Sequence, residues 1–237
     1  MKNLYNIDVG NENIRKSFLS LQVIYNSMPK TSGCESCAET NKDNVHWCCK
    51  TIVPSAYYSE FLYAWENIEK EWTKQDKLDL ILRAIKNHLL DSTTKGCPFY
   101  NNGCTIYENR FLQCRMYGII SRQSWKKRVK NLKQIYGKDY QVTPQCKLVQ
   151  SDVYVDEKKE NTWFQFSKLC ESKIGMSQEI IKEHDSEKGS YRAIHDHILL
   201  YCFDEDMLTN LSTIRLAKLN EKDIDSFLVV LKTKLDV

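Results

Sequence analysis

Cysteines are the residues of this 237-residue chain with the most chemistry to offer, and the ten of them are unevenly spaced. Seven fall in two short windows: Cys34, Cys37, Cys48 and Cys49 in the first, and Cys97, Cys104 and Cys114 in the second. Clustered thiolates are typical ligands of zinc and of iron–sulfur clusters. Since one zinc ion or one cubane cluster uses four ligands, seven thiols predict two centres, or one centre with spare thiols beside it.

The expected compartment favours metal ligands over disulfides. The first ten residues contain no apolar run of a secretory leader, so we expect a cytoplasmic protein, in which clustered thiols stay reduced. A leader peptide lost from the N-terminus would restore the disulfide interpretation. Buried free thiols are a further alternative, but polar loops that contain glycine are a poor place for them. No apolar run approaches the roughly 18 residues of a spanning helix, so we expect no membrane association.

Not every cysteine is expected to be a metal ligand. Cys48 and Cys49 are adjacent and their side chains diverge, so we expect one ligand from the pair, with Cys49 preferred. Cys146 follows a proline in a loop and is a candidate late ligand. Cys170 and Cys202 lie among apolar residues in helical patterns, and we expect them in the core.

Histidines add little to this ligand set. His46, close to Cys48, is a candidate substitute ligand, although a plain loop residue is the commoner outcome. His195 and His197 are two residues apart in a helical pattern, which places them on different faces, so we do not expect them to bind one metal together.

The second window has a more specific pattern. It reads Cys97-Pro98-Phe99-Tyr100, then Gly103-Cys104-Thr105-Ile106-Tyr107-Glu108, then Arg110, Cys114 and Arg115. This string resembles the CPF-x-x-x-G-C-x-IYE-x-RP-x-x-CR signature of the YkgJ-type family, the zinc- or iron-chelating proteins named for a CxxCxxCC motif. The resemblance covers about residues 30–150. Phe111 stands where the family has proline, and ten residues separate Cys37 from Cys48 where the family has about two.

The resemblance implies a bound iron–sulfur or zinc centre in a cytosolic protein. A distant relative, the flagellin lysine-N-methylase group, is linked to an iron–sulfur cluster and to methyl transfer, which offers an enzymatic possibility without assigning one. The candidate metal ligands are Cys34, Cys37, Cys48, Cys49, Cys97, Cys104, Cys114 and Cys146.

Charge considerations add two cofactor-binding candidates, Arg110 and Arg115 beside Cys114. A cubane cluster with four thiolates carries a charge of about −2, which these arginines would offset. Zinc with four thiolates has a similar charge, so charge alone does not choose between the two. We expect one or two iron–sulfur clusters, of the 4Fe–4S type, with zinc as the alternative.

Hydrophobic periodicity predicts a mainly α single domain that positions two irregular cysteine loops. Apolar residues recur at helical spacing over 18–25, 58–72, 78–89, 121–138, 194–203 and 220–235, and Ile180 and Ile181 indicate one further helical element. Asn220 and Asp223 resemble a capping pair at the start of the last helix. Residues 29–50 and 93–118 lack a period and are expected to be the cysteine loops. An antiparallel pairing of the two helices between residues 57 and 90 would bring both loops to one end. Alternating aromatic residues over 149–166, around a charged turn at 156–161, predict one short β-hairpin.

Along the chain, residues 30–150 are expected to form the metal-binding core and residues 151–237 a C-terminal helical region that covers it. Residues 110–150 contain ten basic residues against one acid, so this segment carries +9 while the whole chain carries +3. The helix over 121–138 therefore has a cationic face. We expect this face to be solvated or to dock an acidic partner, and nucleic acid is a less favoured partner.

These features predict an iron–sulfur protein that acts in electron transfer or as a redox, maturation or methyl-transfer enzyme, with a redox partner or a protein or peptide substrate. An iron with a non-cysteine position could act as a Lewis acid toward substrate. The alternative is a structural zinc module that presents the basic helix to a macromolecular partner.

Overall fold

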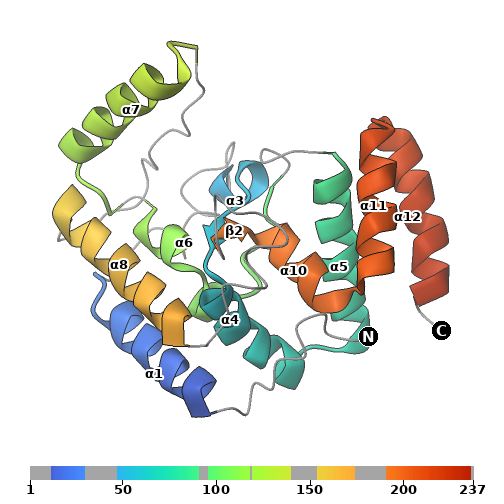
Figure 1. The fold of residues 1–237 in the computed structure, drawn as a ribbon, viewed down its shortest axis with the longest axis horizontal. Helices are drawn as coiled ribbons and strands as arrows, with labels where there is room; N and C mark the ends of the chain where they lie inside the picture. The colour runs from blue at the N-terminus through green and yellow to red at the C-terminus, as the bar shows by residue number, and fades with distance from the viewer. Residues whose placement is uncertain are drawn as a thin grey trace.

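The computed structural model describes residues 12–29, 47–90, 96–117, 119–139, 154–173 and 191–235. These parts of the chain are mainly helical, as predicted, and contain one small antiparallel sheet (Figure 1). The helices are α1 (Glu12–Asn26), α3 (Trp47–Thr51), α4 (Tyr58–Glu71), α5 (Lys74–Leu89), the 3-10 turn η1 (Tyr107–Asn109), α6 (Leu112–Met116), α7 (Arg122–Tyr136), α8 (Glu157–Lys173), α10 (Ile194–Cys202), α11 (Glu205–Leu216) and α12 (Glu221–Leu235). The strands are β1 (Ser55–Ala56) and β2 (Arg192–Ala193).

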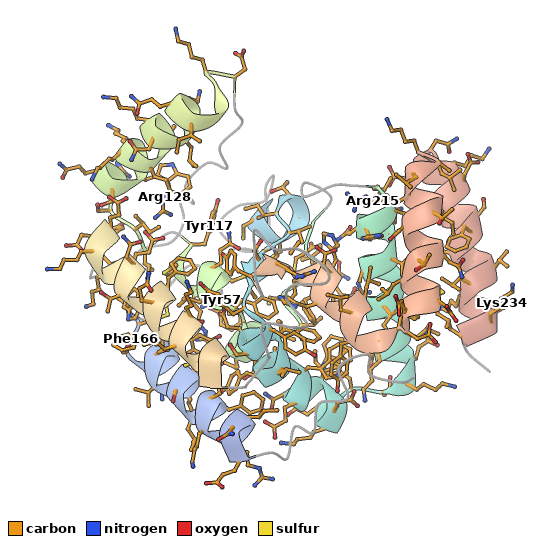
Figure 2. The ribbon with its side chains drawn as sticks, viewed as in Figure 1. Tyr57, Tyr117, Arg128, Phe166, Arg215 and Lys234 are labelled. Carbon is orange, nitrogen blue, oxygen red and sulfur yellow. The ribbon has the colours of Figure 1, made fainter. Side chains whose placement is uncertain are left out.

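Two hydrophobic clusters hold these helices together. The larger one lies among α4, α5 and α10, with α11 and α12 packed on the outer side of α5. The smaller one lies among α1, α6 and α8. Figure 1 shows α1 and α8 side by side at one edge, α11 and α12 at the opposite edge, and α4, α5 and α10 between them. Figure 2 shows how densely side chains fill this central part.

Helices α4 and α5 form where the periodic pattern predicts them, and most residues of their apolar stripes are buried. The start of α5 is fixed by a reciprocal cap: Thr73 Oγ1 accepts from the Asp76 amide at 3.2 Å, and Asp76 Oδ2 accepts from the Thr73 amide at 3.1 Å. Helix α10 packs against both α4 and α5. A third helix, from a distant part of the sequence, therefore packs on the α4–α5 pair.

The two-stranded sheet fixes the start of α10. Ser55 pairs with Ala193, and Ala56 with Arg192. The Ile194 amide then donates to the Pro54 carbonyl at 2.9 Å. This sheet joins residues close to the first cysteine window to the C-terminal region, so α10 is held near that window.

The predicted hairpin over residues 149–166 is wrong. Residues from Glu157 onward form α8, and the Asp156 carboxylate caps it by accepting from the Lys159 amide at 2.8 Å. The charged stretch interpreted as a turn is thus the first turn of a helix. Phe164 packs against the smaller hydrophobic cluster whereas Phe166 is half exposed, although strand alternation would place both rings on one face. Residues 149–153 lie outside the described ranges.

The basic helix α7 is confirmed, with Ser121 as N-cap and Gly137 after its last residue. It stands away from the central helices (Figure 1), and its apolar stripe is only partly covered. Lys127 pairs with Glu157 at 3.1 Å, and Arg128, labelled in Figure 2, pairs with the buried Glu160. These ion pairs connect α7 to α8, and most of the cationic face remains in solvent.

At the C-terminal end, the predicted capping pair is confirmed. The Asp223 amide donates to Asn220 Oδ1 at 3.0 Å at the start of α12. The element expected around residues 180 and 181 lies outside the described ranges. None of the helices in the described ranges is long and apolar enough to cross a membrane.

Candidate metal centre

The two cysteine windows meet through backbone contacts. The Cys97 amide donates to the Cys49 carbonyl at 2.7 Å. Gly96, with φ +89°, lies so close to the first window that a Cβ on it would be 2.7 Å from the Lys50 carbonyl oxygen. On its other side, the Gly96 carbonyl accepts from Asn87 Nδ2 of α5 at 2.9 Å. The end of α5 and the end of α3 are thus joined at Gly96.

A tight turn positions the next two cysteines. The Tyr100 amide donates to the Cys97 carbonyl at 3.0 Å, and Tyr100 forms an antiparallel bridge with Cys104. The Phe99 carbonyl accepts from both the amide and the hydroxyl of Thr105, at 3.1 and 2.7 Å. Phe99 itself is fully buried and anchors the turn in the larger hydrophobic cluster.

Cys114 is positioned by a buried carboxylate. It lies on the short helix α6, whose first amide, that of Leu112, donates to Glu60 Oε1 of α4 at 2.7 Å. Tyr25 Oη donates to the same oxygen at 3.1 Å, and the Tyr57 amide donates to the other oxygen at 3.0 Å. Glu60 therefore fixes α6, and with it Cys114, relative to α1 and α4.

Five cysteines come together at this junction: Cys48, Cys49, Cys97, Cys104 and Cys114, here called the thiol cluster. The Sγ atoms of Cys48 and Cys49 are 3.9 Å apart. Electrostatic interactions connect the two windows, from Cys49 to Cys97 and Cys114, and Cys114 also interacts with Cys104 within the second window. The structure thus gathers the described members of both windows around one volume.

Burial and mutual repulsion shape the acidity of these thiols. Burial raises the pKa of Cys97 to about 12, although a backbone hydrogen bond from Phe99 acts in the opposite direction. Burial, then the neighbouring thiols Cys97 and Cys104, raise the pKa of Cys114. The hydrogen bond between Cys48 and Cys49 lowers the pKa of Cys48 and raises that of Cys49. Cys49, Cys97 and Cys114 therefore hold their protons more strongly than a free cysteine does.

Two arginines approach the thiol cluster. The Arg110 guanidinium, 4.0 Å from the centre of the Tyr107 ring, interacts favourably with thiolate charge on Cys48 and Cys114. Arg83 of α5 interacts with Cys97, and its Nε donates to the Pro98 carbonyl at 2.6 Å. Arg83 is a residue that sequence reasoning missed, because a basic residue on an amphipathic helix carries no signal of the loop it will contact.

The second predicted arginine has a different role. The Arg115 guanidinium lies 4.2 Å from the centre of the Tyr25 ring, and its Nε donates to the Arg110 carbonyl at 2.8 Å. It also donates to the Glu108 carbonyl. Arg115 therefore supports the loop that carries Arg110.

The remaining predicted residues divide into two groups. Cys34, Cys37, Cys146 and His46 lie outside the described residues. Cys170 and Cys202 are buried, in the smaller and larger hydrophobic clusters respectively, as predicted for core residues. Burial also raises the pKa of Cys202 to about 12, in keeping with an inert thiol.

A different group of ligand atoms lies closer together than the thiols. One atom each from His88, His195 and Asp196 lies within 4.8 Å of the other two. No three cysteine sulfurs in the described ranges come that close. His88 gave no signal in the sequence, because its partners follow it by more than a hundred residues.

The chain matches no protein-family model, no curated protein and no solved structure.

Proposed function

We propose that the thiol cluster holds an iron–sulfur cluster, and that the protein uses it for electron transfer or for redox or modification chemistry on a protein or peptide partner. The observation that carries the proposal is the convergence of Cys48, Cys49, Cys97, Cys104 and Cys114 from three separate segments. The resemblance of the second window to the YkgJ-type signature supports the same proposal. The proposal also places the protein in the reducing cytosol.

The donor set suits such a group. Thiolates are the usual ligands of iron–sulfur clusters, and the five described thiols are enough to supply the four ligands of one cubane cluster. Thiolates around one zinc ion, at about 2.3 Å from it, would be about 3.8 Å apart. The described sulfurs are more widely spread, since no three of them lie within 4.8 Å of one another, and this spacing suits a polynuclear group better.

The surroundings would tune the cluster. Arg110 and Arg83 place positive charge beside the thiols, which stabilises a reduced, more negative cluster and raises its reduction potential. The Phe99 amide hydrogen bond to Cys97 acts in the same direction. In this proposal Cys97, Cys104 and Cys114 are ligands, one of Cys48 and Cys49 joins them, and Cys34, Cys37 and Cys146 are further candidates.

Anaerobic purification tests the proposal directly. We expect a brown protein with absorbance near 400 nm, about four iron atoms and matching sulfide per chain, and a paramagnetic signal on reduction. Cys97→Ser and Cys114→Ser should lose most of the iron. Cys170→Ala and Cys202→Ala, which remove buried thiols outside the thiol cluster, should keep it. A colourless protein with stoichiometric zinc would refute the iron–sulfur assignment.

A second candidate function rests on α7. This helix presents lysines and arginines to solvent and stands away from the central helices (Figure 1). A structural zinc site with α7 as a docking element for an acidic macromolecule would use the same residues. Zinc content together with salt-sensitive binding of an acidic polymer, lost when Lys126 and Lys130 are replaced by Glu, would favour this candidate.

A further inference from the structure

His88, His195 and Asp196 form a compact group at the junction of two helices, here called the histidine–aspartate group. His88 lies in the last turn of α5, and His195 and Asp196 are consecutive residues in the first turn of α10. Since α10 packs against α5, the two imidazoles and the carboxylate face one another. His195 is buried, and the His88 side chain is 14% exposed.

The distances from Asp196 to the two imidazoles match those between ligands of one metal ion. Asp196 Oδ1 is 3.5 Å from His88 Nδ1 and 3.3 Å from His195 Nε2. Both distances exceed an ordinary hydrogen bond of about 2.7–3.2 Å. Ligands about 2.1 Å from a common ion are about 3.0 Å apart in octahedral geometry and about 3.4 Å apart in tetrahedral geometry. The observed separations agree with these values.

A further observation fits a cation-binding role. His88 Nδ1 is a buried nitrogen that makes no ordinary hydrogen bond to any described residue. An ionised carboxylate with two imidazoles is a common ligand set for zinc and for ferrous iron.

We infer that His88, His195 and Asp196 bind one divalent first-row transition-metal ion, separate from the thiol cluster. Three protein ligands leave coordination positions for water or substrate, as catalytic sites of this kind require. The inference does not depend on the proposed function, since the histidine–aspartate group contains no cysteine.

The site lies next to the thiol cluster along the chain. His88 follows Asn87, whose side chain donates to the Gly96 carbonyl at 2.9 Å, and Gly96 precedes Cys97. A metal that immobilises the end of α5 would therefore also stabilise the junction of the cysteine windows. The sequence predicted two centres, or one with spare thiols, and this site would supply a second centre without using thiols.

Manganese binding tests the inference, because Mn²⁺ favours oxygen and nitrogen ligands over thiolates. The full chain, purified anaerobically and dialysed against a chelator, should bind one Mn²⁺, seen as loss of the free-ion signal in electron paramagnetic resonance, and Zn²⁺ should displace it. Loss of an outer-sphere partner already weakens metal binding about 10–100-fold. His88→Gln and Asp196→Asn, which remove direct ligands, should therefore weaken it at least about 100-fold.

Matched controls separate this site from the thiol cluster and from misfolding. Asp225 of α12 pairs with Lys86, which lies on α5 as His88 does. Asp225→Asn removes this carboxylate and should leave Mn²⁺ affinity unchanged. Cys97→Ser should lose iron but keep Mn²⁺ binding, so the two assignments can fail independently. Two results would overturn the inference: the wild-type chain fails to bind one Mn²⁺, or its affinity equals that of His88→Gln and Asp196→Asn. The histidine–aspartate group would then be an imidazole–carboxylate ion pair.

Discussion

Replacing Gly96 by alanine would separate the two cysteine windows without removing any candidate ligand. Gly96 has φ +89°, and an added Cβ would lie 2.7 Å from the Lys50 carbonyl oxygen and 3.1 Å from that of Cys49. Both neighbours are backbone atoms and cannot rotate away. The chain at residue 96 must therefore move, and the 2.7 Å hydrogen bond from the Cys97 amide to the Cys49 carbonyl must lengthen or break.

The expected cost follows from these contacts. A left-handed backbone conformation costs a non-glycine residue about 1–2 kcal/mol, and loss of one backbone hydrogen bond costs about 1 kcal/mol. Gly96→Ala should therefore destabilise the protein by about 2–3 kcal/mol. For a chain of this size that lowers Tm by roughly 4–12 °C. Under the proposed function, iron per chain should fall as well, because Cys48 and Cys49 move away from Cys97.

Two other glycines serve as matched controls. Gly137 has φ +100° but open space around its Cβ position, so Gly137→Ala tests backbone strain without a collision. Gly103 has neither a positive φ nor a close neighbour, since no atom lies within 4 Å of its added Cβ. Gly103→Ala should therefore change the free energy of unfolding by less than about 0.5 kcal/mol. Thermal unfolding and iron analysis of all three variants measure the difference. If Gly96→Ala is as stable as Gly103→Ala and keeps its iron, the junction at Gly96 does not hold the windows together.

Three more predictions concern the surrounding framework. Glu60→Ala leaves buried donors, including Tyr25 Oη, without their acceptor, and should lower the free energy of unfolding in urea by about 3–5 kcal/mol. Glu60→Gln should lower it less, and equal losses of stability in both variants would contradict the role of the carboxylate. Thr73→Ala removes the cap of α5 and should cost about 1 kcal/mol, seen as a Tm lower by about 2–4 °C, and an unchanged Tm would argue against the cap. Arg110→Gln removes positive charge near Cys114 and should lower the reduction potential of the proposed cluster in a redox titration, whereas an unchanged potential would show that Arg110 does not tune it.

Local signals in the sequence were enough to locate most helices. The apolar stripes of α4 and α5, the cap at Ser121 and the Asn220–Asp223 pair are interactions between residues three or four positions apart. Such interactions depend on little beyond the local chain, so periodicity and cap residues predict them. The same logic failed for α8, because a charged first turn followed by aromatic residues fits a hairpin or a helix until the partner surface is known.

The sequence by itself therefore determined a mainly helical protein, and it separated the core thiols Cys170 and Cys202 from the rest. It was wrong to place Cys48, Cys49 and Cys114 in irregular loops, because they lie on the short helices α3 and α6. Only the tertiary structure decided what lies around these cysteines. Arg83 reaches the thiol cluster, Glu60 holds α6, and His88 meets His195 and Asp196 through the docking of α10 against α5. These contacts join residues far apart in the chain, and no local pattern encodes them, because they arise from how whole helices bury their apolar faces together.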